Sequence, residues 1–334
     1  MARAVVVLAF GFALADSLPG RALGDGVAVV LAQFATPVLQ LFDPGILRSG
    51  TELRGAGGWA VRVSEVCDGH GLAISLAAGL AGLAAGAGDG LRRLWLGLLA
   101  IQVFNLVRIV VLALVLSEAP AAFDTVHVVV FPLLTVALLA VAVLPLSRAL
   151  PLLALALPLV LVWLAIADTV AQVLVPPANL ILSALAGPEV GQIAHRAAGW
   201  TIGTNLLASD AAGQVSLFLA PLRPADFALA LPVVLAATAL TRRSVWLIPF
   251  VVSMLAALSL AAVTAVWGLA AAQAPATLVV PDGSGAFVTQ DFTPPETLRA
   301  LLRLAQNTLV HLNLLVLPFL IAARGRKAGG GRNA

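Results

Sequence analysis

Three residues of this sequence have side chains that could act together in acyl transfer: Cys67, Arg108 and His127. A cysteine thiol becomes a nucleophile when a neighbouring Arg or protonated His lowers its pKa, and Cys67 is the single cysteine of the chain. A guanidinium can stabilise the oxyanion of a tetrahedral intermediate, and an imidazole can carry a proton to a leaving amine. The three residue types therefore form a coherent set for a nucleophilic mechanism, provided that the fold brings them together.

The composition of the chain indicates a membrane protein. Of the 334 residues, 61% are apolar and only 10% are charged, whereas a soluble chain carries about 25% charged residues. This number of charges is too small to cover the surface of a soluble protein of this size. We therefore expect the lipid bilayer to solvate most of the surface. One cysteine excludes an internal disulfide, and the lack of a long basic face excludes nucleic acid as a partner.

Long runs without formal charge, some interrupted by a single Arg, predict helices that cross the bilayer. Backbone amides in lipid must be satisfied within the segment, which favours helices over strands. Since a span needs roughly 20 apolar residues, we expect an all-α, polytopic helical bundle with about 7–9 transmembrane helices. The runs are residues 4–15, 26–42, 71–88, 94–117, 125–147, 149–167, 227–241, 244–281 and 304–323.

Three segments do not read as spans. In residues 43–66, apolar Val61, Val63 and Val66 alternate with polar neighbours, which predicts a short extended or interfacial segment before Cys67. Residues 168–226 and 273–303 are long and mixed in polarity, and each contains a Pro-Pro pair that indicates a turn. We expect these two segments to be outward-facing loops.

The basic residues predict the orientation of the chain. They fall at every second connection, at residues 92–93, 148, 242–243 and 324–327. Such connections face the cytoplasm. Arg108 follows the 92–93 pair on an outward helix, so at about 1.5 Å per residue it lies in the outer half of the bilayer. Cys67 and His127 lie at the outer starts of inward helices, so all three residues are expected at one depth.

Each candidate taken alone has a simpler interpretation. A single Cys in a membrane helix is usually a small apolar filler, and a His at the interface usually makes local hydrogen bonds. Arg108 could extend to the interface or pair with a structural carboxylate. However, an Arg in the bilayer costs at least about 2.5 kcal/mol, and Asn105 lies one turn earlier on the same helix face. That pairing favours a buried polar site.

Three short strings resemble the signature regions of the exosortase/archaeosortase family in order and spacing. They are SEVCDGHG (64–71), NLVRI (105–109) and FDTVH (123–127), and the resemblance covers roughly residues 26–146. It implies a membrane cysteine protease or transpeptidase whose substrates carry a C-terminal sorting signal: a short motif, a transmembrane helix and a basic cluster. It also implies Cys67 as nucleophile, with Arg108 and His127 as the second and third catalytic residues. Asn105 matches the Asn that precedes the family's Arg by three.

The residues beside this set have supporting roles that the sequence leaves open. Where the family pattern has Ser-Gly and an apolar residue, this chain has Asp68, Gly69 and His70, which leaves the substrate class open. Gly69 fits a tight turn that brings the backbone close to the thiol. Asp68 either caps the next helix or accepts a hydrogen bond from the candidate arginine. Asp124 either caps a helix or orients the ring of His127.

We therefore expect residues 1–148 to form an exosortase-like catalytic membrane domain and residues 149–334 an accessory membrane region with the two outward loops. The expected activity is cleavage or transpeptidation of membrane-anchored proteins that carry the sorting signal, through a thioester on Cys67. The alternative is a polytopic transporter or membrane scaffold in which Arg108 is an anion or structural site. No cofactor is expected, and no metal, because the His residues have no ligand spacing.

The expected location is the bacterial inner (plasma) membrane. The chain would cross it several times with the active site facing outward, and the oligomeric state is left open.

Overall fold

The structure is a computed structural model of the chain. It describes residues 1–64, 69–83, 87–196, 199–209, 215–222, 230–272, 276–281 and 286–324. Within these residues, six helical stretches are long and apolar enough to cross a membrane: Leu18–Gln40, Gly88–Glu118, Pro120–Val143, Leu146–Ile166, Ser244–Ala272 and Glu296–Ala323. The predicted helical membrane protein is supported by these six stretches, while the count of 7–9 spans stays a prediction.

The described residues also contain eight strands in two antiparallel sheets, so the expectation of an all-α chain is wrong in this respect. The first sheet is the meander β1 (Leu47–Ser49), β2 (Glu52–Arg54) and β3 (Ala60–Arg62), in the segment predicted to be extended. The second sheet has five strands and occupies the two segments expected to be loops.

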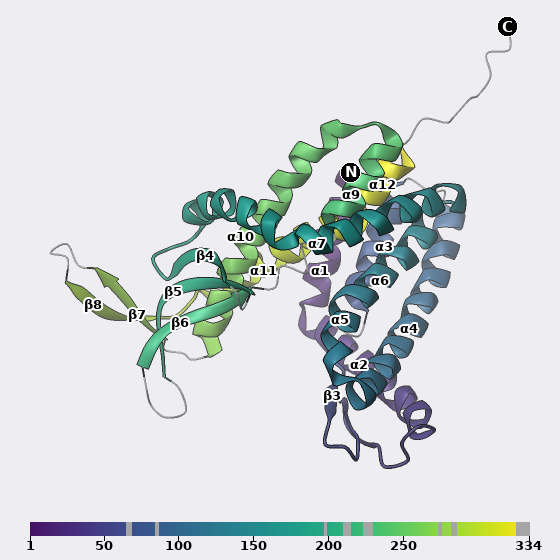
Figure 1. The fold of residues 1–334 in the computed structure, drawn as a ribbon, viewed down its shortest axis with the longest axis horizontal. Helices are drawn as coiled ribbons and strands as arrows, with labels where there is room; N and C mark the ends of the chain where they lie inside the picture. The colour runs from purple at the N-terminus through teal and green to yellow at the C-terminus, as the bar shows by residue number, and fades with distance from the viewer. Residues whose placement is uncertain are drawn as a thin grey trace, which may run out of the picture. The chain divides into compact units, whose positions relative to one another are not determined.

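The chain divides into two compact units, each described here by itself. The helical unit comprises residues 1–157, 233–243 and 314–334, and the sheet unit comprises residues 158–232 and 244–313. Helix α7 (Leu146–Leu185) is continuous over 40 residues; residues 146–157 belong to the helical unit and residues 158–185 to the sheet unit (Figure 1).

In the helical unit, two short helices pack closely. They are α1 (Ala2–Ala15) and α3 (His70–Gly82). A Cβ added to Gly11 of α1 would lie only 2.7 Å from Cγ2 of Ile74, so the small residue permits the close approach of the two helices, as is common in membrane proteins.

Two helical stretches of the helical unit form an antiparallel pair. Helix α4 (Ala87–Glu118) is 32 residues long. After a 3₁₀ turn (Pro120–Ala122) the chain returns through α5 (Phe123–Thr125), a π-helical turn (Val126–Val130) and α6 (Phe131–Val143). The rings of Phe104 and Phe131 join the two helices edge to face, with centroids 5.8 Å apart.

The meander is fixed to two of these helices by an apolar cluster. Leu53 and Val63 are 0% and 2% exposed and pack with Leu39 of α2 (Leu18–Gln40) and Ile109 of α4. At about 25 cal/mol per Å², burial of such side chains stabilises this arrangement by roughly 1.5–3 kcal/mol each. The last strand before Cys67 is therefore held beside α4.

The sheet unit surrounds a separate core. Its strand order is β4-β5-β7-β8, and β6 also pairs with β5. The strands are β4 (Val190–Arg196), β5 (Gly199–Ser209), β6 (Val215–Leu222), β7 (Ala276–Pro281) and β8 (Phe287–Phe292). Helices α10 (Leu247–Ala272) and α11 (Glu296–His311) pack on each other.

Short elements complete the described chain. They are α9 (Ala230–Thr241), a 3₁₀ turn (Ser244–Trp246), a π-helical turn (Leu312–Val316) and α12 (Leu317–Ala323).

The turn expected at Pro176-Pro177 is wrong, because α7 continues to Leu185. Ala178 and Leu182, just after the proline pair, are buried in the core of the sheet unit. The side chain of Asn179 also exchanges two hydrogen bonds with the backbone of Ile193, of 2.8 and 3.0 Å. These contacts with β4 favour the helix beyond the prolines. At Pro294-Pro295 the chain passes from β8 into α11, and Pro295 is the N-cap of that helix.

Candidate active site

The buried face of α4 carries two hydrogen-bond donors without acceptors in the described part of the chain. Asn105 is 1% exposed, and within the described part of the chain its Nδ2 has no partner. Arg108 follows three residues later, is half-buried, and its Nε is likewise buried and unpartnered among those residues. Residues three apart lie next to each other on a helix. Together they make a donor-rich strip on one side of α4.

Gly69 lies directly against this strip. It is the N-cap of α3 and adopts φ +83° and ψ 7°, the left-handed conformation that favours glycine. A Cβ at this position would lie 2.2 Å from Nδ2 of Asn105 and 2.9 Å from Cγ2 of Ile101. Gly69 thus has the left-handed backbone that only glycine adopts readily, and its lack of a side chain lets the backbone approach the carboxamide of Asn105.

Arg108 also contacts the returning helix. Its Cζ lies 5.9 Å from the centroid of the Phe131 ring, within the range of a cation–π interaction. His127 is half-buried. It precedes Phe131 by four residues, so it lies about one helical turn before that ring on the returning helical stretch. Phe131 thus links the element that carries the arginine to the element that carries the histidine.

The backbone at His127 is a π-helical turn, Val126–Val130. Such turns are rare in proteins, but those that occur are often found at functional sites. The ring of His127 lies 5.5 Å from that of Phe123, at an interplanar angle of 52°. The local backbone at the predicted third catalytic residue is therefore unusual in a way that its sequence did not indicate.

Two of the predicted site residues, Cys67 and Asp68, lie outside the described residues. The chain on both sides of them is anchored to α4. Val63 is buried with Ile109, and Gly69 lies against Asn105. Among the described residues, Gly69 thus lies against Asn105, and Arg108 follows Asn105 on the same face of α4.

Of the two roles predicted for Asp124, the helix cap is wrong. The N-cap of α5 is Ala122, and no side chain caps this helix. Asp124 instead lies in the first turn and is exposed. A carboxylate there still interacts favourably with the positive end of the helix dipole.

Two apolar residues that sequence reasoning missed complete the site. Ile101 packs against Gly69, and Phe131 contacts Arg108. The helical spacing contains the signal for both, since Ile101 precedes Asn105 by four residues and Phe131 follows His127 by four.

Within the described ranges, no group of His, Cys, Asp and Glu side chains is arranged to hold a metal ion. Comparison with known proteins gives no family assignment: no protein-family model, curated protein or solved structure matches the chain.

Proposed function

We propose that the protein is a membrane-embedded cysteine protease or transpeptidase of the exosortase/archaeosortase type. Its substrates would be membrane-anchored proteins with a C-terminal sorting signal. The observation that carries the proposal is a pair of donors, Asn105 Nδ2 and Arg108 Nε, that have no partner among the described residues. Gly69 lies against Asn105. Gly69 follows Cys67 by two residues, and two residues of extended chain span at most about 7 Å.

The unpartnered donors favour a transient acceptor. A buried donor without a partner costs about 1–3 kcal/mol, so its retention points to a use elsewhere in the functional cycle. A tetrahedral oxyanion is such an acceptor, because it carries full negative charge and forms only during the reaction. Donors arranged before it forms stabilise the transition state more than the substrate.

The reaction would follow from these groups in two steps. The thiolate of Cys67 attacks the substrate carbonyl carbon, and the oxyanion accepts hydrogen bonds from Arg108 and Asn105. Collapse of this intermediate breaks the C–N bond, and the leaving amine takes a proton from His127. Water or a second amine then attacks the thioester and releases the thiol, which gives proteolysis or transpeptidation.

The same donors also favour a second candidate function. A strip with one guanidinium and one carboxamide could bind an anion during transport, or hold the bundle together, with Cys67 incidental. This alternative needs Arg108 but no thiol.

Substitution of the thiol separates the two functions. A substrate protein with a C-terminal anchor is expressed with the enzyme in cells, and its maturation is followed by its change in size. Cys67→Ala should abolish maturation at unchanged enzyme level, and Arg108→Lys should strongly reduce it because a lysine lacks the planar fork.

The matched control is Thr36→Ala on α2, which removes a 2.7 Å hydrogen bond to the carbonyl of Ala32 and should mature substrate normally. Normal maturation by the Cys67→Ala variant would favour the transporter or scaffold.

A further inference from the structure

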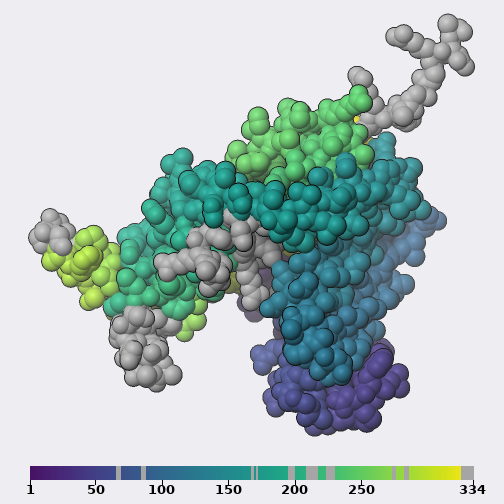
Figure 2. Space-filling view, viewed as in Figure 1, coloured from purple at the N-terminus to yellow at the C-terminus, as the bar shows by residue number. Residues whose placement is uncertain are grey.

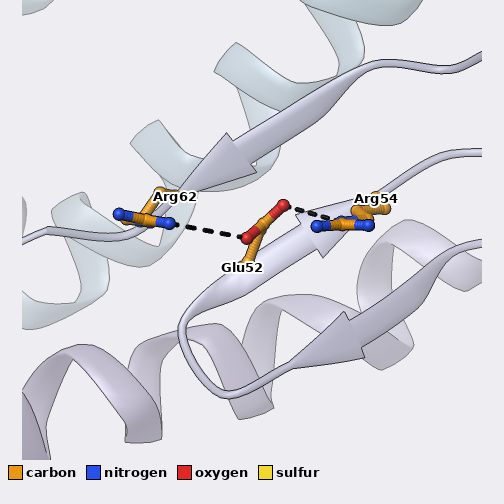
Figure 3. A network of polar contacts seen from close by, with 3 residues as sticks. All are labelled: Glu52, Arg54 and Arg62. Atoms are coloured by element: carbon orange, nitrogen blue, oxygen red, sulfur yellow. Dashed lines mark hydrogen bonds and ion pairs between the residues drawn. The ribbon is translucent and has the colours of Figure 1, made fainter.

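The outer face of the β1–β3 meander carries a cluster of charges. Glu52 lies opposite Arg62 in the strand pairing, and Arg54 is two residues along β2, so the three side chains share one face of the sheet. One carboxylate oxygen of Glu52 lies 2.6 Å from Nε of Arg54, and the other lies 3.7 Å from Nη2 of Arg62. Figure 3 shows the carboxylate between the two guanidiniums.

The positive charges of this face are not cancelled. On this face Arg54 and Arg62 stand against the single carboxylate of Glu52. Arg48 pairs with Leu53 and therefore lies on the opposite face, where it donates a 2.9 Å hydrogen bond to the carbonyl of Gly50. The side chains of Arg54 and Arg62 are 66% and 74% exposed, whereas that of Glu52 is 22% exposed. A guanidinium has five N–H donors, so contact with one carboxylate still leaves donors for an anion.

Exposed apolar side chains adjoin these arginines. Leu41 and Phe42 follow the last residue of α2, one of the six candidate spans, and are 83% and 65% exposed. Leu47 is 70% exposed and pairs directly with Arg54 across the strands. The meander and the C-terminal end of α2 pack on each other and lie in the purple part of the surface in Figure 2.

We propose that the β1–β3 meander is a membrane-surface element that binds the phosphate groups of anionic phospholipids through Arg54 and Arg62. Its exposed leucines and phenylalanine would lie at the boundary of headgroups and acyl chains, where amphipathic surfaces of this kind bind. An acidic peptide could use the arginines as well, but it would leave Leu41, Phe42 and Leu47 in water. The combination of cationic and apolar side chains therefore favours lipid.

Glu52 gives this surface a second, testable property. Its carboxylate holds the two guanidiniums in place but also competes with lipid phosphate for their donors. Each basic charge near an anionic membrane changes binding about fivefold, from roughly 1 kcal/mol per charge. Removal of the negative charge of Glu52 should therefore strengthen lipid binding, whereas removal of either arginine should weaken it.

The test uses the full chain purified in a neutral detergent. Its thermal unfolding is followed while phosphatidylglycerol or phosphatidylcholine with the same acyl chains is added. Phosphatidylglycerol should stabilise the wild type at lower concentration than phosphatidylcholine. The double variant Arg54→Gln/Arg62→Gln should lose about 30-fold in apparent affinity for phosphatidylglycerol alone, as expected for two charges.

Two further variants make the outcome decisive. Glu52→Gln should gain about fivefold in apparent affinity for phosphatidylglycerol, which a purely structural ion pair would not produce. Arg54→Lys/Arg62→Lys should keep most of the affinity, because lipid phosphate also accepts hydrogen bonds from an ammonium.

An unchanged preference for phosphatidylglycerol in the double glutamine variant would overturn the proposal. Equal stabilisation by glycerol phosphate would also overturn it, since the site would then bind a soluble anion. Displacement of the lipid by a soluble acidic peptide would overturn it as well, since the site would then bind a protein partner.

Discussion

Substitution of Gly69 by alanine tests the packing on which the candidate site depends. The new Cβ would lie 2.2 Å from Nδ2 of Asn105 and 2.9 Å from Cγ2 of Ile101, so the carboxamide must move. The backbone at Gly69 has φ +83°, which costs a residue with a side chain about 1–2 kcal/mol. Displacement of well-packed neighbours adds about 1–3 kcal/mol. We therefore expect a total loss of about 2–5 kcal/mol.

A matched control in the same chain separates the two contributions. Gly58 has φ +82°, and a Cβ there would meet no atom within 4 Å. Gly58→Ala should therefore cost only the backbone part, about 1–2 kcal/mol. Thermal unfolding of the wild type and both variants, in the same detergent and followed by tryptophan fluorescence, should give the largest decrease in midpoint for Gly69→Ala.

A double variant tests whether the contact with Asn105 is responsible. Asn105→Ala removes the carboxamide that the new Cβ would meet, so Gly69→Ala should be less harmful in that background. The reasoning would be refuted if Gly69→Ala were no more destabilising than Gly58→Ala, or if its cost were the same with and without the Asn105 side chain.

Three other predictions follow from the described contacts. Asn105→Ala should leave the thermal midpoint unchanged or raised, because it removes a buried donor that has no partner among the described residues. The same variant should mature substrate about 100-fold more slowly, as for loss of an oxyanion donor. A loss of stability in proportion to the loss of activity would contradict this prediction. Trp267→Phe should destabilise the sheet unit by about 1–3 kcal/mol, because the Trp267 indole donates a buried 2.8 Å hydrogen bond to Glu189. Addition of Glu189→Gln to that variant should recover part of the lost stability, as measured by thermal unfolding. The hydrogen bond from Arg54 holds the pKa of Glu52 below its ordinary 4.5. This pair should therefore stabilise the folded protein fully above about pH 4.5 and lose that contribution as the pH falls. The thermal midpoint of the Glu52→Gln variant should lack this part of the acid dependence.

The helices of the helical unit could be predicted because their apolar runs are long. Helix α4 crosses Arg108 without interruption, as the sequence indicated, since backbone amides in lipid must be satisfied within the segment. The extended segment before Cys67 was also predicted correctly, from alternating valines. Its packing was not, because burial of Leu53 and Val63 depends on partners in α2 and α4 that are distant in sequence.

The five-stranded sheet was missed although part of its signal is present. Along β5, Trp200, Ile202, Thr204 and Leu206 are buried and alternate with less buried residues, which is the period of a strand with one face in the core. The mixed polarity of that alternation was interpreted as a loop. The continuation of α7 past its proline pair could not be predicted locally, because it depends on the contacts with β4.

Part of the candidate site followed from residue types and spacing. Asn105 and Arg108 were expected on one face of a helix, and the structure places them so. Two other features could not be read from the spacing. Among the described residues these donors have no acceptors, and Gly69 approaches Asn105. Both features depend on how α3 and α6 pack against α4. The roles of Cys67, Asp68 and His127, and of residues 149–334 as an accessory region, stay predictions.

The most direct test of the proposed chemistry is to trap the acyl group on the thiol. Purified enzyme in nanodiscs is mixed with a substrate protein, quenched in acid, digested and analysed by mass spectrometry. We predict that the N-terminal part of the cleaved substrate is attached to Cys67 as a thioester that hydroxylamine releases. Replacement of His127 by Ala should reduce this adduct, because the thioester forms only when the leaving amine takes its proton. Cleavage of the substrate by the wild type with no adduct on Cys67, or undiminished cleavage by Cys67→Ser, would contradict the proposed mechanism.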